Sequence, residues 1–437
     1  MPASPSLLIV PARFKTGKLY TQIATTSAGV VLGSSGDFNV TRATTATRFN
    51  SAGLIESVAS GVPRLDYYTS GGTAGCPALL VEPSAANGIL NSQDTATNWT
   101  LGINLTSGYT DVIGVSGNNL TVAASGSNIG AAPGRMQRGS NNVALASGST
   151  YTISFLMRQT GTHTIGGYYA AITGGAAGDL GAGFNVSGSF SSGSLFVYTG
   201  ATNRIRRVER FGADVYRCSE TFTMTASGTL TAFNLAPLSG VTSQFNPAVG
   251  LGIAFAAPQI ELGAIPTSFI PTTTAAVTRN ADVITLSGAV SGCIGQTEGT
   301  IYAEVDLRNT SSGKRLFLLS DGTTQNEIRV TSSATNAGDL QFAVRLAGTL
   351  ILNAFSPTNV YSNGIFKIAA VYKSTDYALY VNGLQVLTSN AAGNIPACNR
   401  VDIGSQLGTS NFLNDRIRSV ALYTTRLTDA ELQALTT

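Results

Sequence analysis

Short runs in which apolar and polar residues alternate make up most of this chain. Examples are YTISFLMR (151–158), FKIAAVYK (366–373) and YALYVNG (377–383), which lie between clusters of Gly, Asn, Ser and Pro. A period of two is typical of β-strands with one buried face, and closely spaced turn residues are typical of sandwiches and jelly rolls. The pattern therefore predicts an all-β fold.

Two local patterns are more specific. The C-terminal TDAELQALTT (428–437) predicts a helix, with Thr428 and Glu431 as a capping box and apolar residues on one side. Asn382-Gly383, between two alternating runs, predicts a hairpin with a type I′ turn.

Turn residues and composition divide the chain into four parts. Residues 1–88 are expected to form an irregular N-terminal adaptor, and residues 89–271 a first sandwich that contains Trp99 in its core. Residues 272–286, rich in Thr, Ala and Val, are expected to be a linker, and residues 287–437 a second sandwich. The prediction is two tandem β-sandwich or jelly-roll domains that follow an adaptor segment.

Charge is scarce in these 437 residues. Charged residues make up 11%, against roughly 25% in ordinary globular chains, and the formal net charge is +3. Such a chain has no strong field to attract nucleic acid or anionic lipid. No apolar run approaches the ~18 residues of a membrane helix, and LLIV (7–10) is too short and proline-flanked for a signal peptide. We expect neither nucleic-acid binding nor membrane insertion, and interpret LLIV as a strand or anchoring arm.

The four cysteines are too far apart in sequence for a zinc knuckle. They are Cys76, Cys218, Cys293 and Cys398. Free thiols, as in a chain folded in reducing cytoplasm, are the preferred interpretation, and a Cys293–Cys398 bridge is the alternative.

Three stretches resemble a segment that recurs in bacteriophage tail and virion-surface proteins. They are FNVTRATTATRFNSAGLIESVASGVPRLDY (38–67), GGTAGCPALLVEPSAANGILNSQD (71–94) and QIELGAIPTSFIPTTTAAVTRNAD (259–282). In those proteins similar stretches frame a sandwich that resembles a carbohydrate-binding module. We call residues 38–94 and 259–282 the signature segments. The first of the three stretches (38–67) is expected to cover the sandwich that follows it, with Arg64 and Asp66 paired.

The last third resembles the concanavalin A-like, laminin-G-like jelly roll. The resemblance rests on FKIAAVYKSTDYALYVNGLQV (366–386) and VDIGSQLGTSNFLNDRIRSVALYTTRLTDAEL (401–432). Laminin-G-like domains often bind calcium at a rim, which makes Asp321 and Asn326 weak candidates for a Ca²⁺ site. No other cofactor is expected.

Together the resemblances imply a bacteriophage virion structural protein of the tail-fibre, collar or head-fibre class. It would lie on the virion surface, be assembled in the host cytoplasm, be released by lysis and adhere to host surface polysaccharide. The implied partners are other virion proteins and further copies of the chain, with a trimer favoured, and residues 1–37 are the candidate attachment segment. The alternatives are a purely architectural virion protein, a polysaccharide depolymerase and a bacterial adhesin.

The residues argue against an enzyme. Glu304 and Asp306 share one strand face, as the carboxylates of a glycosidase would, but Arg308 occupies the next position on that face. The single histidine, His163, has no Gly-x-Ser-x-Gly motif beside it and is expected in a surface hairpin. We expect no catalytic residue.

Sugar binding requires exposed aromatic rings, because the C–H face of a sugar stacks on them. The candidates are Tyr168, Tyr169, Tyr361 and Tyr377. The basic run NRIRRVER (203–210) is interpreted as a solvated face or a salt-bridge site, with a site for an acidic surface polymer as the alternative.

Overall fold

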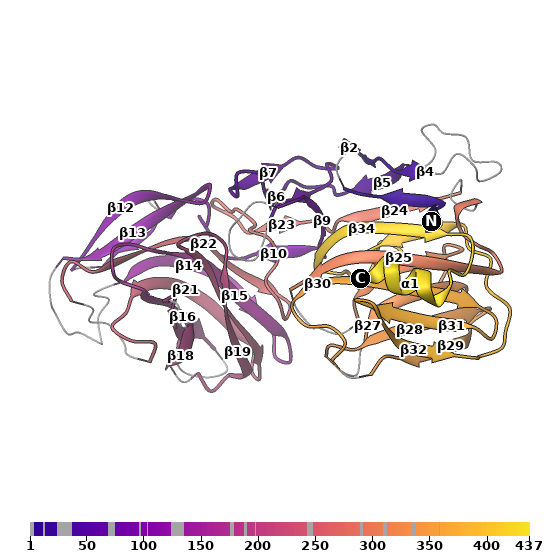
Figure 1. Ribbon diagram of the computed structural model, residues 1–437. Coiled ribbons are helices and arrows are strands. Elements are labelled where there is room, and N and C mark those ends of the chain that lie inside the picture. Colours follow the sequence, from indigo (N-terminus) through magenta and orange to yellow (C-terminus); the bar gives the residue numbers. More distant parts are fainter. Residues whose placement is uncertain are drawn as a thin grey trace.

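The computed structural model describes residues 4–11, 14–23, 37–68, 75–95, 98–102, 104–123, 135–174, 179–187, 190–196, 198–242, 248–288, 292–308, 313–333, 337–357 and 359–437. Figure 1 shows two β-sandwiches side by side, one drawn in magenta and one in orange to yellow. The indigo N-terminal strands lie along the second sandwich. The all-β prediction is confirmed.

The central sandwich is built from the middle of the chain. Its first sheet has the order β11 (Thr100–Leu101), β14 (Met136–Leu145), β21 (Gly228–Pro237), β16 (Ile165–Thr173), β17 (Asp179–Asn185), β18 (Ser191–Phe196). Its second sheet has the order β12 (Leu105–Val112), β13 (Val115–Val122), β22 (Gly252–Leu262), β15 (Thr150–Gln159), β20 (Val215–Met224), β19 (Ala201–Arg210).

The C-terminal sandwich also has two sheets. One has the order β32 (Leu384–Ser389), β31 (Tyr377–Val381), β30 (Gly364–Lys373), β25 (Glu298–Leu307), β34 (Asp415–Tyr423), β1 (Leu7–Ile9), β4 (Gln22–Ile23). In the same sheet β34 also pairs with β9 (Ala78–Val81), and β9 pairs with β8 (Leu65–Asp66). The other has the order β2 (Phe14–Lys15), β3 (Lys18–Leu19), β5 (Phe38–Thr41), β24 (Val283–Ser287), β33 (Arg400–Ile403), β26 (Arg315–Ser320), β27 (Glu327–Ser332), β28 (Leu340–Leu346), β29 (Thr349–Phe355).

The N-terminal residues differ from the expected irregular adaptor, because they supply strands to the C-terminal sandwich. β1 and β9 pair with β34 on the side opposite β25, and β5 pairs with β24. The physical reason is that a strand edge with free N–H and C=O groups needs a partner, and these segments provide it. LLIV (7–10) is thus largely a core strand; residues 24–36 of the proposed attachment segment lie outside the described residues.

The central sandwich is therefore an insertion. The chain begins in the C-terminal sandwich, leaves it after β10 (Ala85–Asn87) and returns through β23 (Val277–Arg279), which pairs with β10. The expected linker 272–286 contains β23 and most of β24, so it is part of the fold. A short hairpin of β6 (Ala46–Phe49) and β7 (Ile55–Val58) lies at the junction of the two sandwiches.

The local predictions are confirmed. α1 (Asp429–Thr436) begins after Thr428, and the reciprocal capping box with Glu431 is present. Asn382 and Gly383 both have positive φ, 47° and 80°, as a type I′ turn between β31 and β32 requires. Trp99 is buried in the central core, edge-on to Phe233 with ring centroids 6.3 Å apart.

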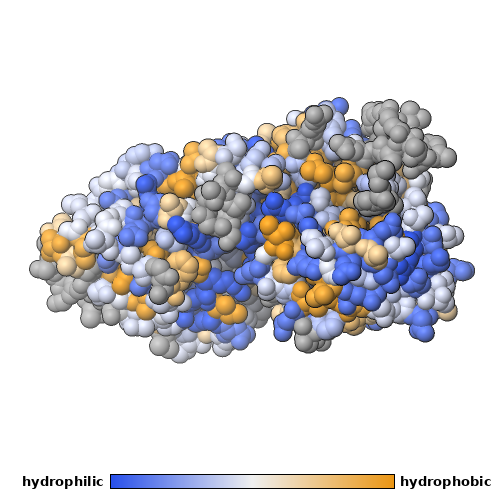
Figure 2. Space-filling view, in the orientation of Figure 1, coloured by the Kyte–Doolittle hydropathy of each residue, from blue (hydrophilic) through white to orange (hydrophobic). Residues whose placement is uncertain are grey.

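Each sandwich has its own apolar core, and a further apolar cluster lies at the junction. The C-terminal core includes Leu7, Phe38 and Leu79 from the first part of the chain. The junction cluster combines Phe49 and Tyr68 with residues of the central sandwich. Figure 2 shows two lobes with hydrophilic and hydrophobic residues mixed over this face. No helix among the described residues has the length and apolar character to cross a membrane.

Candidate functional site

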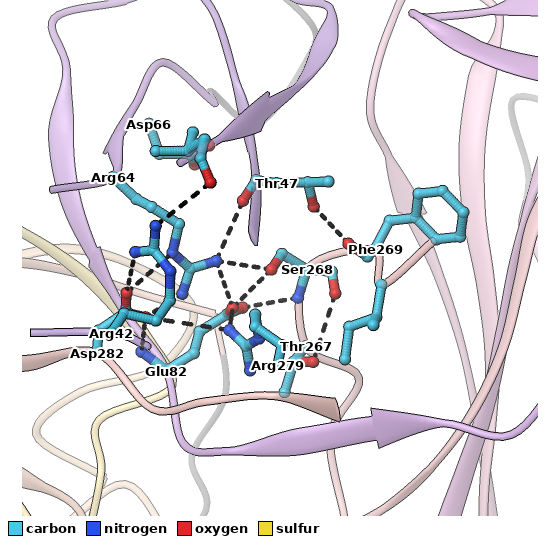
Figure 3. Close-up of polar contacts among 12 residues, drawn as sticks. Arg42, Thr47, Arg64, Asp66, Glu82, Thr267, Ser268, Phe269, Arg279 and Asp282 are labelled. Atoms are coloured by element: carbon cyan, nitrogen blue, oxygen red, sulfur yellow. Dashed lines mark hydrogen bonds and ion pairs between the residues drawn. The ribbon is translucent and has the colours of Figure 1, made fainter. Parts of the chain in front are cut away.

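Five charged side chains form a buried cluster at the junction. Arg42 follows β5, Arg64 precedes β8, Glu82 follows β9, Arg279 ends β23 and Asp282 precedes β24. Figure 3 shows them converging from these strand ends. Their side chains are at most 5% exposed. In a chain with so few charges, this concentration marks the junction as a specifically built feature.

The cluster is held by direct ion pairs. Arg64 contacts both carboxylates: its Nη1 lies 2.7 Å from Glu82 Oε2, and its Nη2 pairs with Asp282. Arg42 Nη1 lies 2.9 Å from Asp282 Oδ1, and Arg279 pairs with Glu82. Arg42 also donates to the carbonyl oxygens of Thr44 and Ala59, at 3.0 and 2.6 Å. These carbonyls offset the extra positive charge of three arginines against two acids.

The second signature segment bonds to this cluster from the central sandwich. The Ser268 N–H and hydroxyl each donate to Glu82, both at 2.7 Å, and Arg64 Nη1 donates to Ser268 Oγ at 2.7 Å. The Thr47 hydroxyl donates to the Phe269 carbonyl at 2.5 Å. The cluster therefore ties the exit of the central sandwich to the strands of the C-terminal one (Figure 3).

A second, uncharged network joins the same two segments. Asn87 Nδ2 donates to the carbonyl oxygens of Pro258 and Ile270, at 3.1 and 2.9 Å. Ser92 and Thr272 exchange bonds: the Ser92 N–H donates to Thr272 Oγ1 and the Thr272 N–H donates to Ser92 Oγ, each at 3.0 Å. The signature segments, more than 160 residues apart in sequence, are thus one structural element that clamps the insertion in place.

The expected Arg64–Asp66 pair is replaced by other partners. Arg64 is directed to Glu82 and Asp282, while Asp66 accepts from the Phe49 N–H at 2.6 Å and pairs with Arg416. Residues two apart share a strand face, which made an Arg64–Asp66 pair plausible, but their actual partners come from segments far away in sequence. The scarcity of charge is a signal in the sequence that points to this cluster, because several of the few acids and arginines, Arg42, Glu82 and Asp282 among them, fall in the signature segments.

Electrostatics hold Glu82 in its charged form. Burial by itself would raise the pKa of Glu82, but the charges of Arg279 and Arg64 and the Ser268 hydrogen bond outweigh it and lower the pKa well below its usual range. A buried carboxylate that is fully paired in this way is costly to leave unpaired.

We call the buried cluster of Arg42, Arg64, Glu82, Arg279 and Asp282 the clamp. Acidification should destabilise it. Because the folded-state pKa of Glu82 is depressed, its contribution to stability is complete above its ordinary value of 4.5 and is lost as the pH falls below it. Between pH 5 and pH 3 we expect the wild-type melting temperature to fall more than that of Glu82→Gln, by at least ~3 °C, the shift that about 1 kcal/mol produces in domains of this size. Calorimetry at both pH values checks this.

The matched control is Glu56→Gln, which removes the partly exposed pair between Arg48 and Glu56. It should keep the wild-type dependence on pH. Equal pH dependence in the wild type and Glu82→Gln would contradict the assignment of acid sensitivity to Glu82.

A pocket of about 560 Å³ lies beside the clamp. Its lining combines Phe49 and Tyr68, the outer face of β19 and β20, and residues 308 and 414–416 of the C-terminal sandwich. The Tyr68 hydroxyl donates to Glu209 Oε1 at 2.8 Å. The guanidinium carbons of Arg416 and Arg308 lie 4.5 and 4.9 Å from the Tyr68 ring centroid, within cation–π distance.

The four tyrosines proposed to bind sugar lie elsewhere and are buried. They are Tyr168, Tyr169, Tyr361 and Tyr377, with exposed fractions of 0 to 3%. Tyr168, for example, stacks on Phe233 with centroids 5.5 Å apart and donates to Glu220 Oε2 at 2.6 Å. None offers an exposed ring face to a ligand in this structure: both faces of β16 and of β31 are covered, and Tyr361, between β29 and β30, is buried in the C-terminal core.

The candidate calcium ligands are engaged in local hydrogen bonds. Asp321 Oδ1 accepts from the Thr323 N–H and hydroxyl, and Asp321 Oδ2 accepts from Asn326 Nδ2. Asn326 Oδ1 also accepts a hydrogen bond, from the Ala347 N–H at 2.9 Å. Both side chains serve local turns, and within the described residues no group of three His, Cys, Asp or Glu side chains is arranged as a metal site.

The remaining candidates also have structural partners. Glu304 pairs with Arg418 and Asp306 with Arg308, so the two carboxylates of β25 are not a free catalytic pair. His163 is buried, contrary to its expected surface position, and burial lowers its pKa. Arg204 and Arg206 both pair with Glu220, which agrees with the salt-bridge interpretation of that run.

The four cysteines are free thiols, as preferred from the sequence. Cys76 is exposed, and Cys218, Cys293 and Cys398 are buried.

The family comparison concerns the last third of the chain. Residues 278–433 match the family model of the concanavalin A-like lectin/glucanases superfamily. This agrees with the resemblance seen in the sequence and with the two-sheet architecture. The matched range begins one residue before Arg279, so the clamp residues Arg279 and Asp282 fall within this concanavalin A-like sandwich.

Solved structures give more distant similarities. The CBM40 of a Ruminococcus gnavus IT-sialidase is 19% identical, over 33% of this chain and 84% of that one, with a TM-score of 0.29. Domain 4 of AbnA, a GH43 extracellular arabinanase from Geobacillus stearothermophilus, is 9% identical over 40% and 82%, with a TM-score of 0.32. At such TM-scores these similarities carry no argument about function. No curated protein sequence matches this chain.

Proposed function

We propose that this chain is a non-catalytic structural protein of the bacteriophage virion surface, in the tail-fibre, collar or head-fibre class, and that it adheres to host surface glycans. The observation that carries the proposal is the clamp. The segments that resemble recurrent phage virion sequences are the ones that build it, through Arg42, Arg64, Glu82, Arg279 and Asp282.

The clamp has a plain mechanical use on a particle surface. An inserted sandwich that is fixed by buried ion pairs and hydrogen bonds cannot swing freely, so both sandwiches are presented in one orientation. Weak single contacts with a glycan are then multiplied by copy number. We propose accordingly that the chain assembles as a homo-oligomer, with a trimer favoured, next to other virion proteins.

The absence of catalysis is part of the proposal. The carboxylates that a glycosidase would need as a pair, Glu304 and Asp306, are engaged by Arg418 and Arg308. Retaining and inverting glycosidases alike need both carboxyl groups directed at one glycosidic bond.

A purely architectural role is the second candidate, and one observation favours it. The tyrosines first considered for sugar binding are buried, so glycan contact has to come from another surface. In that case the clamp would serve particle stability alone.

The test uses the full chain, fluorescently labelled and multimerised, on a panel of bacterial strains with and without their surface polysaccharide. Binding that is lost when the polysaccharide is stripped supports adhesion. Absence of binding to every strain favours the architectural role, and release of reducing sugar would show a depolymerase. Gold-labelled antibodies against the chain should decorate particles released by lysis of the source cells; undecorated particles would contradict the virion location.

A further inference from the structure

The pocket beside the clamp has a wall of unusual composition. β19 and β20 pair so that Arg207 is opposite Ser219 and Glu209 is opposite Arg217, which places these four side chains on one face of the sheet. All four line the pocket. The face is the outer one of the central sandwich, since the alternate residues Val208 and Cys218 pack toward the core.

The arginines that line this part of the pocket keep N–H groups that make no hydrogen bond within the described residues. Arg217 uses Nη2 for Ser154 Oγ and the Thr267 carbonyl, at 2.9 and 2.6 Å, and within the described residues its Nε and Nη1 make no bond. Arg207 is exposed and has no hydrogen bond or ion pair there. Arg210 also lines the pocket, but it alternates with Glu209 and so belongs to the other face of β19; its side chain bonds only to the carbonyl oxygens of Gly212 and Ala213. No carboxylate of the described residues lies within ion-pair distance of these three guanidinium groups.

The acids of the lining are already engaged. Glu82 belongs to the clamp, Asp66 pairs with Arg416, and Asp415 lies 3.5 Å from Lys314 Nζ. Glu209 accepts the Tyr68 hydroxyl. Burial raises the pKa of Asp415 to about 7 and lowers the pKa of Arg217, so the surroundings disfavour isolated charge. An incoming anion would relieve the cost of the partly buried, unpaired Arg217.

An aromatic ring completes the arrangement. Phe190 lines the pocket and is 49% exposed, with its ring 5.5 Å from that of Tyr216. An exposed ring in the same pocket lining as unpaired guanidinium groups suits a ligand with an apolar C–H face and an anionic group, since rings stack on sugar faces and arginine binds carboxylate in a bidentate manner. The volume, about 560 Å³, lies within the roughly 300–1,000 Å³ of small-ligand sites.

We propose that this pocket binds an acidic sugar unit of a glycan, with its carboxylate on Arg217 and Arg207 and its ring face on Phe190. The inference rests on the proposed glycan adhesion and names both its site and its class of ligand. The pocket is formed between the sandwiches, so the clamp that fixes their orientation also preserves the site.

The experiment is calorimetric titration of the full chain with oligomers of galacturonate, mannuronate and sialate, each beside its carboxyl-reduced neutral form. We expect binding of at least one acidic oligomer, with affinity at least about tenfold above its neutral form, the size expected for hydrogen bonds to a charged group. Arg217→Gln, Arg207→Gln and Phe190→Ala should each weaken it by about tenfold or more. Arg207→Gln disturbs no hydrogen bond or ion pair among the described residues, so its melting temperature should stay at the wild-type value, which separates lost binding from misfolding.

Matched controls lie on the same sandwich outside the pocket. Arg158→Gln removes an arginine that pairs with Asp214, and Tyr109→Ala removes a ring that is 70% exposed. Both should change affinity by less than about twofold, within the range of surface substitutions. Binding of neutral and acidic oligomers alike, or binding unchanged in Arg207→Gln and Phe190→Ala, would overturn the pocket assignment while leaving glycan adhesion in place. Absence of binding to every saccharide would overturn both.

Discussion

Arg64→Met should lower the free energy of unfolding by about 3–5 kcal/mol, the range for removal of one partner from a buried ion pair. Arg64 contacts both Glu82 and Asp282 and is fully buried, so its loss leaves two buried carboxylates with reduced compensation. Arg42 and Arg279 would retain part of the compensation. Calorimetry and urea unfolding of the full chain measure the change.

Arg48→Met is the matched control for that experiment. Arg48 pairs with Glu56 at 2.8 Å, but their side chains are 18% and 36% exposed, and such pairs contribute about 1 kcal/mol or less. The double variant Arg64→Met with Asp282→Asn should lose less than the sum of the two single variants, because the two residues interact directly. Equal losses for Arg64→Met and Arg48→Met would show that the clamp does not stabilise the fold.

Residues 287–437 alone should fail to fold, although they were expected to be a complete domain. The C-terminal core takes ten buried side chains from outside that range. They are Leu7, Ile9, Leu19, Phe38, Val40, Leu65, Leu79, Val81, Ile284 and Leu286. At ~1.5–3 kcal/mol each, their loss exceeds the roughly 5–15 kcal/mol of a typical domain. β34 and β33 would also lose the strands that pair with them on one side.

A second variant, a shortened chain without the central sandwich, serves as the comparison for this prediction. Asn87 and Val277 are opposite each other in the β10–β23 pair, so an Asn-Gly turn between them should replace residues 88–276 and close a hairpin. We expect this shortened chain to fold, with dispersed amide resonances and cooperative unfolding, while residues 287–437 show neither. Cooperative unfolding of residues 287–437 would mean that the N-terminal strands are dispensable.

The comparison of sequence and structure separates two kinds of inference. Features that depend on neighbours within a few residues were predicted correctly: the Thr428–Glu431 capping box, the Asn382-Gly383 turn and the alternating strands. Trp99 was also placed correctly in the core, an expectation that came from its position in the segment that resembles virion-surface proteins. The resemblance of the last third to concanavalin A-like domains agrees with the matched family model.

Features that depend on residues far away in sequence were not predicted correctly. Alternation does not say whether the second face of a strand is covered, so Tyr168 and Tyr377 were candidates for sugar contact although both are buried. The domain limits were taken from changes in composition, and nothing local indicates that β1, β5, β9 and the short strands near them complete sheets whose remaining strands follow residue 282. Arg64 had a plausible partner two residues away, yet its partners are Glu82 and Asp282.

By itself the sequence determined the all-β class, the strand-and-turn pattern, the capped terminal helix and the two signature segments, because these follow from backbone geometry and side chains close along the chain. Only the tertiary structure decided that the central sandwich is an insertion, that the signature segments meet as a buried clamp, and that unpaired arginines and an exposed ring line a pocket beside it. The reason is that burial and ion pairing depend on which surfaces meet, and these meet across more than 160 residues of sequence.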